Sequence, residues 1–495
     1  MSRLREENNL ARPPSLLERI RSMNQQVIVD LTIILAVSAI GYLIRVDKLN
    51  GYSSEDDAAY VAACGLIMQG YIPHRDFFLA HPPGFFFFVT LIWKLLGLKN
   101  PQTMWYVGKI VCFLSFIGVS AAIYLLCRNA LKNRSAGLLG VFIYQLSSQS
   151  LLFSTACAPQ IPATLLIIIL VYLVLDPSPK TRWKLFTIGL LLGVAVITRL
   201  SSLYLLPIFF LYLIFKDQPE ILEWRELAYL AVGLVLPIAA MIAIIPTDSL
   251  WFNLVLFHFL KGGTTMQAKI EKFLLTLTGR ELPHLLGLIS TPYILSKRDR
   301  RVNFLLGQSV LLLGPYFMQA TPGAHLLVES SPLFAILTAV TISETVKSIF
   351  KKRRSLFTIG LSVLLLSTIL IGLPRATTEL SDVLQKTTLE GRIYRKLVDI
   401  VERETNEEDM VFSQIPVVPF LAGRDYPPFM DTSQSAKDAG IYTPDVVAYL
   451  VLNYNVKLLV VWYRTAEDLS SFLQTHGFVR IERLEGYWIY LRIEK

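Results

Sequence analysis

The sequence predicts a polytopic α-helical membrane protein that ends in a soluble α/β domain. Of its 495 residues, 53% are hydrophobic and only 17% are charged, and the mean hydropathy is +0.50. A soluble globular protein of ordinary composition is less apolar. Apolar stretches that can cross a hydrocarbon core of about 30 Å recur from Val27 to Leu373 and then stop. We therefore expect a cytoplasmic N-terminal arm over residues 1–26, a transmembrane domain over 27–373 and a C-terminal domain over 374–495.

Basic residues between the apolar stretches orient the predicted helices, because Lys and Arg collect in cytoplasmic loops. We predict eleven spans, at residues 27–46, 104–127, 135–156, 160–175, 184–199, 201–216, 226–246, 282–296, 303–320, 332–346 and 355–373. With these spans the N-terminus and every basic loop lie in the cytoplasm, and the C-terminal domain lies on the opposite side. The same loops account for the net charge of +9, so nucleic acid is not expected as a partner.

One further apolar run, Pro82 to Leu98, is not counted as a span. It begins with two prolines and a glycine and contains Lys94, and as a helix of about fifteen residues it would reach only about 22 Å. We expect it to dip into the outer leaflet, so that residues 47–103 form one external loop with two juxtamembrane helices. The alternative is an ordinary short span, which would place every later basic loop outside. Within the loop, Arg75 either provides a cation at the membrane surface or forms a local ion pair with Asp76 that fixes the loop, and the ion pair is slightly favoured.

An acidic cluster, Glu55-Asp56-Asp57, opens the first of these two helices just beyond the first span. Adjacent carboxylates at the membrane surface can provide a general base for an acceptor hydroxyl. Helix capping is the competing explanation, because Ser54 and Asp57 have the spacing of a capping box and the helix dipole favours acids in a first turn. Capping accounts for Glu55 and Asp57 better than for Asp56. Asp56 is therefore the first candidate for a catalytic role, and Asp57 is the second.

Three motifs occur together in this loop: DDAAY at residues 56–60, GYIPHRDFF at 70–78 and HPPG at 81–84. Over residues 45–100 the sequence resembles the first periplasmic loop of the GT-C membrane glycosyltransferases. The most similar branch contains the protein O-mannosyltransferases and lipid A aminoarabinose transferases, described as dolichyl-phosphate-mannose-protein mannosyltransferase-like. The resemblance implies that Asp56 is the catalytic base and that Tyr60 supports the loop. It also places Asp57 where glutamate is usual and His81 where lysine is usual, and a histidine is cationic only part of the time near neutral pH.

The resemblance implies transfer of a sugar, with inversion at the anomeric carbon, from a polyprenyl-phosphate donor to an acceptor hydroxyl at the outer face. Cations at headgroup depth would stabilise the departing lipid phosphate. Arg199 lies at the outer end of a span, and His258 and Lys261 share a helix face three residues apart. The alternative for both cations is a snorkelling or interfacial anchor.

A late external turn, residues 321–332, places His325 four residues before Glu329. On a helix the two side chains would share a face, where they contact the sugar or its phosphate, or form a hydrogen-bonded pair that holds the loop. A metal site is conceivable, but no ligand pair has a recognised spacing, so no required metal or other cofactor is expected. The residues considered for that site are His81, His258, His325 and Glu329.

The C-terminal domain shows helical and strand-like segments in alternation, which predicts a small α/β layer. It contains no glycine-rich nucleotide-binding motif. Covering the active site or selecting the acceptor is a hypothesis for its role. The predicted helices are 389–404, 444–453 and 466–475, and the predicted strands are 410–413, 458–462, 479–483 and 488–493.

The expected protein is thus a membrane glycosyltransferase with a lipid, glycan or protein acceptor. A lipid-linked glycan polymerase or ligase is the main alternative, although it usually lacks an acidic cluster directly after the first span. A lipid or glycolipid transporter is less favoured, because repeats and mid-span charges are scarce in this sequence. The soluble domain has no N-x-[ST] sequon and the chain ends without a retention signal, which favours a bacterial inner membrane. The sequence does not determine the sugar or the oligomeric state.

Overall fold

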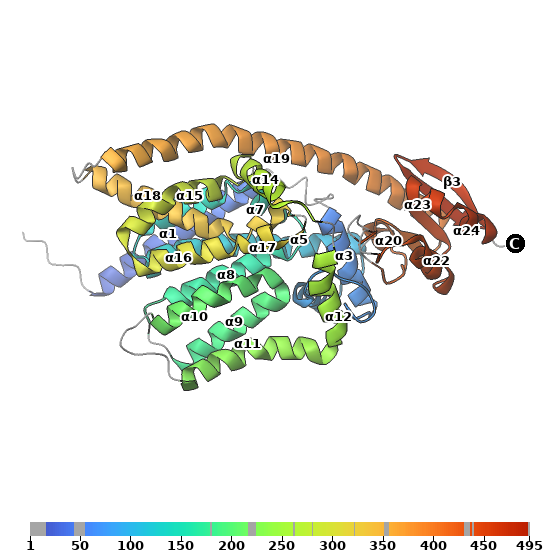
Figure 1. The fold of residues 1–495 in the computed structure, drawn as a ribbon, viewed down its shortest axis with the longest axis horizontal. Coiled ribbons are helices and arrows are strands. Elements are labelled where there is room, and N and C mark those ends of the chain that lie inside the picture. The colour runs from blue at the N-terminus through green and yellow to red at the C-terminus, as the bar shows by residue number, and fades with distance from the viewer. Residues whose placement is uncertain are drawn as a thin grey trace, which may run out of the picture.

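A bundle of helices and a small α/β unit make up the chain, and one long helix joins them (Figure 1). The computed structural model describes residues 16–43, 55–178, 181–215, 224–260, 263–279, 281–320, 322–350, 356–429, 436–437 and 440–493. In the bundle the elements are α1 (Leu16–Leu43), α3 (Glu55–Met68), α4 (Gly84–Leu95), α5 (Pro101–Leu125), η1 (Leu126–Ala130), α6 (Arg134–Tyr144), α7 (Ser148–Phe153), α8 (Gln160–Leu175), α9 (Arg182–Thr198), η2 (Leu200–Leu205), α10 (Leu206–Phe215), α11 (Trp224–Ile244), α12 (Thr247–Trp251), η3 (Phe252–Leu256), α13 (Phe257–Leu260), α14 (Met266–Gly279), α15 (Leu282–Lys297), α16 (Arg300–Leu311), α17 (Gly314–Met318), η4 (Ala324–Leu327), α18 (Ser331–Phe350) and α19 (Leu356–Glu404).

Most predicted spans correspond to one helix with nearly the predicted bounds, as α8, α11, α15 and α18 show. Within the described chain, three helical segments are each long and apolar enough to cross a membrane by length and composition: residues 101–130, 224–244 and 331–350. Several other apolar helices are shorter. The number of crossings and their direction stay predictions.

Two predicted spans, 135–156 and 303–320, are wrong as continuous helices. The first divides into α6 and α7, because residues 145–150 are mostly polar and Ser147 caps a new helix by accepting a hydrogen bond from the Ser150 amide at 3.0 Å. The second divides into α16 and α17 just before Gly314 and Pro315, where proline has no amide hydrogen to donate.

The two helices predicted for the first external loop are present as α3, which Figure 1 labels, and α4. Helix α4 has 12 residues, about 18 Å at 1.5 Å per residue, so it is too short to cross the hydrocarbon core. Its buried face, which includes Phe86 and Trp93, packs on α3, α5 and α9. Other predicted spans also contain helices this short, such as α10 and α16, so whether α4 crosses the membrane stays a prediction.

Close helix contacts and an ion pair with a buried carboxylate help to hold the bundle together. Helices α9 and α11 pack with Gly189 against the backbone of Leu230, where a Cβ would lie within 3.0 Å of the Leu230 carbonyl group. Asp30 joins α1 to the bundle, because its buried carboxylate accepts two hydrogen bonds from Arg134, both at 2.7 Å, and one from Tyr124. Such a pair holds an otherwise apolar helix in one position.

Helix α19 runs along the bundle and continues into the C-terminal unit (Figure 1). It has 49 residues with Pro374 inside, so the predicted boundary between 373 and 374 lies within a continuous helix. The predicted span 355–373 and the predicted helix 389–404 are two parts of this one element. Its apolar side chains at Leu364 and Leu370 are exposed in the isolated chain, as expected for a helix that faces lipid.

The C-terminal unit is a four-stranded sheet in the order β1-β2-β4-β3, with β1 and β2 parallel and the other pairs antiparallel. The predicted strands and the helix at 444–453 are confirmed, whereas the predicted helix 466–475 is two short helices. Both faces of β2 are buried, which explains its uninterrupted apolar sequence LLVVW. The elements are β1 (Val411–Ser413), α20 (Val417–Leu421), α22 (Pro444–Asn453), β2 (Leu458–Trp462), α23 (Tyr463–Asp468), α24 (Ser470–Thr475), β3 (Phe478–Leu484) and β4 (Tyr487–Arg492).

The two faces of this sheet pack into different cores. Phe412, Leu459 and Val461 form a core with α22 and α24. Leu458 and Val460 belong instead to the large core that continues through the helical bundle. The C-terminal unit therefore shares its packing with the rest of the protein.

Candidate active site

Asp57 anchors α3 to the bundle. Its carboxylate is fully buried and accepts hydrogen bonds from the Trp105 indole at 2.9 Å and the Cys157 amide at 2.7 Å. The ammonium group of Lys109, also fully buried, lies 3.3 Å from the other carboxylate oxygen and 4.1 Å from the centre of the Trp105 ring. These partners come from α5 and the turn after α7, so the carboxylate of Asp57 serves tertiary contacts. Its burial does not support the predicted direct role in catalysis.

Asp56 occupies a different position on the same helix. Successive residues of an α-helix are about 100° apart, so the anchored Asp57 directs the Asp56 side chain to another side of α3. Asp56 is half-buried, whereas Asp57 is fully buried. Of the two acids, Asp56 is therefore the more exposed. Glu55 is the first residue of α3, but its side chain and all of Ser54 lie outside the described residues.

Tyr60 and His81 connect the two juxtamembrane helices. The buried Tyr60 hydroxyl lies 2.8 Å from His81 Nε2, and the two rings meet edge to face at 5.2 Å. His81 is half-buried and precedes the two prolines that lead into α4. Gly84 begins α4 at a close approach to α9, because a Cβ there would lie 2.6 Å from the Ile197 carbonyl oxygen. This contact brings the start of α4 next to the end of α9, which leads into Arg199.

Arg199 and Glu329 form a buried ion pair through Arg199 Nε and Glu329 Oε1. Arg199 Nη2 also donates to the His325 carbonyl oxygen at 3.5 Å. Burial raises the pKa of the Glu329 carboxyl, and the guanidinium of Arg199 opposes this shift. The predicted shared helical face of His325 and Glu329 is wrong, because His325 lies in the short 3₁₀ turn η4 and Glu329 follows in a turn. The partner of Glu329 in this ion pair is Arg199, the residue directly after α9.

A buried polar network that the sequence analysis missed lies beside this ion pair. Glu281 and His284 are fully buried, with Glu281 Oε2 3.1 Å from His284 Nδ1, and His284 Nε2 lies 2.7 Å from the Ser330 hydroxyl. The Glu281 carboxylate also accepts hydrogen bonds from the Ser147 hydroxyl at 3.0 Å and from the backbone amide of Gln149 at 3.2 Å. An acid and a histidine three residues apart at the start of a predicted span were the available signal.

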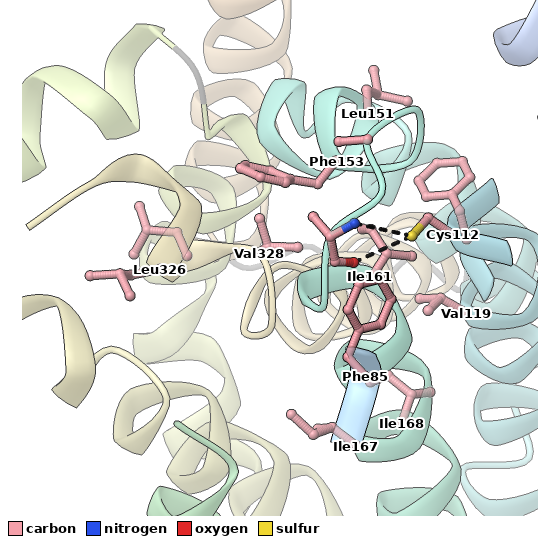
Figure 2. Packing of buried hydrophobic residues seen from close by; sticks show 14 of the residues in the cluster. Phe85, Cys112, Val119, Leu151, Phe153, Ile161, Ile167, Ile168, Leu326 and Val328 are labelled. Carbon is pink, nitrogen blue, oxygen red and sulfur yellow. Dashed lines mark hydrogen bonds between the residues drawn. The ribbon is translucent and has the colours of Figure 1, made fainter. Parts of the chain in front are cut away.

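The segment from 147 to 157 contacts several of these groups. It contacts Glu281 at its start and donates the Cys157 amide to Asp57 at its end. Between them, the Phe153 ring lies 6.4 Å from the His325 ring. Figure 2 shows Phe153, Leu326 and Val328 as members of one buried cluster, and the two hydrogen bonds between Cys112 and the backbone of Ala158. The acidic helix and the Arg199 ion pair therefore share one buried support.

Other predicted residues lie in supporting positions. Arg75 and Asp76 form the expected local ion pair at 2.8 Å, and the Arg75 hydrogen bond lowers the pKa of Asp76. His258 Nε2 contacts the Ala80 carbonyl oxygen at 3.2 Å, so α13 holds the segment just before His81. Lys261 lies outside the described residues.

His74 supports the same loop and was not among the predicted site residues. It has a positive φ of 64°. The Nδ1 of this buried residue lies 3.1 Å from the side-chain amide nitrogen, Nδ2, of Asn253 in η3. Burial lowers the pKa of His74 to about 4. The imidazole is therefore neutral near pH 7 and can act as a hydrogen-bonding group within the folded loop.

No group of three or more His, Cys, Asp or Glu side chains in the described part of the chain could hold a metal ion. In particular, the set considered from the sequence is not assembled. Glu329 is paired with Arg199, and His81 is paired with Tyr60.

Comparison with protein families finds a match over the part of the chain that contains α4 to α11. Residues 80–245 match the family model described as dolichyl-phosphate-mannose-protein mannosyltransferase. The matched region includes His81, Lys109 and Arg199 and ends before the C-terminal unit. No curated protein sequence matches the chain at a significant level.

The fold is similar to that of solved membrane glycosyltransferases over nearly the whole chain. ArnT from Cupriavidus metallidurans bound to undecaprenyl phosphate has a TM-score of 0.65 at 12% identity, and the alignment covers 93% of this chain and 98% of that chain. The Archaeoglobus fulgidus oligosaccharyltransferase in the apo form has a TM-score of 0.57 at 11% identity, covering 94% of this chain and 74% of that chain.

The archaeal oligosaccharyltransferase AglB from Archaeoglobus fulgidus, in complex with an inhibitory peptide and a dolichol-phosphate, gives a TM-score of 0.55 at 11% identity, with 93% of this chain and 74% of that chain covered. At such low identity these structures establish the fold, and the match over residues 80–245 adds the sequence relationship. The chain therefore has the fold of these GT-C-type membrane glycosyltransferases, and over residues 80–245 its sequence is similar to the mannosyltransferase family.

Proposed function

We propose that the protein is an inverting glycosyltransferase that moves a sugar from a polyprenyl-phosphate donor to an acceptor hydroxyl at the extracytoplasmic face of the membrane. The observation that carries this proposal is the different placement of two adjacent acids. Asp57 is buried and bound by Trp105, Lys109 and Cys157, while Asp56 is half-buried on another side of the same short helix. One acid fixes the helix, and the other is presented as a general base.

In the proposed reaction, Asp56 accepts the proton of the acceptor hydroxyl while the oxygen attacks the anomeric carbon of the donor. The bond from that carbon to the lipid phosphate breaks on the opposite face, so the configuration inverts. Charge develops on the departing phosphate, where a fixed cation is most effective in a site that excludes water. The products are the glycosylated acceptor and the free polyprenyl phosphate.

Arg199 is the described cation that fits this second role. Two of its nitrogens are engaged by Glu329 and the His325 carbonyl group, and Nη1 is buried without a hydrogen-bond partner among the described residues. A guanidinium fixed on two sides can direct its remaining donors to a phosphate oxygen. Lys261 is proposed as a second cation from its place in the sequence alone, and His81 and His258 are proposed as support for the first loop.

The donor class is supported by what the similar proteins are named for. The ArnT structure contains undecaprenyl phosphate, one oligosaccharyltransferase structure contains a dolichol-phosphate, and the matched family is named for a dolichyl-phosphate-linked mannose. The acceptor is proposed only as a hydroxyl of a lipid, glycan or protein. We further propose residence in a bacterial inner membrane, with the N-terminus in the cytoplasm.

The test is Asp56→Asn in a strain that lacks the chromosomal gene. The wild-type gene on a plasmid should restore the glycan or glycolipid that mass spectrometry finds missing in the deletion strain. Loss of a general base costs roughly 10²- to 10⁴-fold in rate, so the Asn variant should restore little of it, and Asp56→Glu should restore more. Asp248→Asn, which changes an exposed acid at the start of α12, is the matched control. Wild-type product from a correctly inserted Asn variant would overturn the proposal.

A further inference from the structure

We infer that the C-terminal unit is a fixed brace that holds α3, the helix that carries Asp56, in its working position. This inference rests on the proposed function of Asp56. It assigns to Tyr426 and Phe420 a positioning role in the reaction, although both residues lie more than 350 positions from the acidic cluster along the chain.

The first contact is a buried hydrogen bond to the backbone of α3. The Tyr426 hydroxyl donates to the Ala62 carbonyl oxygen at 2.6 Å, and Tyr426 is 3% exposed. The Ala62 carbonyl lies inside α3, where it already has an acceptor role in the helical hydrogen-bonding pattern. A second, external donor at this position fixes the helix against rotation and sliding.

The second contact is apolar and depends on a glycine. At Gly65 a Cβ would lie closer than 3.0 Å to the Tyr426 hydroxyl and to the Phe420 ring, so only glycine allows α20 to approach α3 this closely. The Phe420 ring also stacks on Trp93 of α4, with 6.1 Å between the ring centres and an angle of 21° between the planes. The C-terminal unit thereby holds both juxtamembrane helices.

A third contact lies at the solvent-exposed edge of the same interface. Gln69, just beyond α3, donates its side-chain amide to the Asp425 carboxylate at 2.9 Å. Farther from this edge, Val417 and Phe420 belong to the same continuous core as Val61 and Leu66 of α3. The interface therefore has a buried apolar centre and a polar rim.

The position of Asp56 on α3 distinguishes a brace from a lid. Asp56 and Gly65 are nine residues apart, and at about 100° per residue their side-chain directions differ by about 180°. The C-terminal unit therefore contacts the side of α3 opposite to Asp56. A lid would have to close over the acid, whereas this contact supports the helix from behind and leaves the acid accessible.

The test compares Tyr426→Phe and Phe420→Ala with Tyr449→Phe, a control on an exposed tyrosine of the same unit (63% exposed). Hydrogen exchange of the full-length protein reports directly on α3. Loss of one buried hydrogen bond should speed exchange of the α3 amides roughly fivefold in Tyr426→Phe, and more in Phe420→Ala. The apparent kcat should fall by at least a similar factor, with the KM for the acceptor unchanged, while the control matches the wild type.

A crosslink tests whether the brace is fixed. The four native cysteines are buried, and Gln69 and Asp425 are exposed, so a Q69C/D425C variant can be joined selectively by a short bismaleimide. We expect the crosslinked protein to keep the turnover of the same variant without crosslinker, with each single-cysteine variant as a control. Loss of turnover on crosslinking would show that the unit must move, and a rise in acceptor KM alone would show acceptor selection. Either result overturns the brace.

The exchange measurement needs no enzymatic activity, so it separates this inference from the proposed function. Unchanged α3 exchange in both variants would reject the brace even if Asp56 is the base. Faster α3 exchange together with a fully active Asp56→Asn variant would keep the mechanical contact and reject the positioning role.

Discussion

Replacing Lys109 with methionine should show how strongly the buried Asp57 anchor stabilises the protein. Methionine has nearly the same length as the lysine stem and removes only the charge and the donor. In the wild type, the Lys109 ammonium lies 3.3 Å from Asp57 Oδ2, and both side chains are fully buried. The variant therefore leaves a buried carboxylate without its counter-charge.

The expected cost follows from this distance. Two unit charges at 3.3 Å attract each other by about 5 kcal/mol at an effective dielectric constant of about 20. Removing one partner of a buried pair typically costs about 3–5 kcal/mol. The Trp105 indole and the Cys157 amide still donate to Asp57, so we expect the lower end, about 3 kcal/mol.

A double-mutant cycle isolates the pair. Asp57→Asn keeps an oxygen that can accept from Trp105, so the Asp57→Asn/Lys109→Met variant has no unpaired charge. It should be more stable than Lys109→Met alone by about 2 kcal/mol. Unfolding of the purified protein in mixed micelles, followed by circular dichroism during titration with a denaturing detergent, measures these differences.

The control for this experiment is Lys94→Met, which removes an exposed lysine of α4. It should unfold like the wild type. If Lys109→Met also unfolds like the wild type, or if the two single changes simply add in the double variant, the buried ion pair does not anchor α3 and the assigned role of Asp57 is wrong.

Two further predictions concern the loop and the ion pair. Burial lowers the pKa of His74 to about 4, below the ordinary value of about 6.5, so the neutral imidazole stabilises the fold above pH 6.5 and this contribution falls as the pH drops towards 4. The free energy of unfolding of the wild type should fall by about 3 kcal/mol over that range. In a denaturant titration His74→Asn, which tolerates the positive φ, should lose less stability over the same range, and His476→Asn serves as the control. A His74→Asn variant whose stability depends on pH as steeply as that of the wild type would contradict the assignment. Lysine in Arg199→Lys cannot keep both contacts of the guanidinium, so donor turnover should fall at least tenfold in an assay of lipid-phosphate release. Glu329→Gln should lower the turnover less. Wild-type turnover of the Arg199→Lys variant would refute the proposed phosphate contact.

Local sequence patterns predicted the secondary structure of the C-terminal unit well. The strands at 458–462 and 487–492 and the helix at 444–453 lie where runs of apolar residues and turn residues indicate them. Long spans with interior polar residues were predicted less well. Two of them are divided at Ser147 and at Pro315. A capping side chain and a missing amide hydrogen each act at a single residue, and hydropathy averaged over a whole span does not detect such local effects.

Local sequence patterns could not predict which residues contact the site residues. Asp57 meets Trp105 and Cys157 across 48 and 100 residues, and Tyr426 meets Ala62 across 364. Helical and strand periodicity reports on residues within a few turns of each other. The prediction that Glu329 and His325 share a helical face followed that short range and was wrong, because the two residues lie in a 3₁₀ turn and the turn after it. The ion pair of Glu329 is with Arg199, which is 130 residues away along the chain and follows α9.

By itself the sequence determined the membrane class, the acidic cluster at the start of α3 and the α/β character of the C-terminal unit, because composition and periodicity carry this information. Only the tertiary structure decided which of the two adjacent acids is fully buried and anchored. That choice depends on buried donors from α5 and from the turn after α7. Burial and charge pairing depend on which segments fold together, and neighbouring residues along the chain do not specify that.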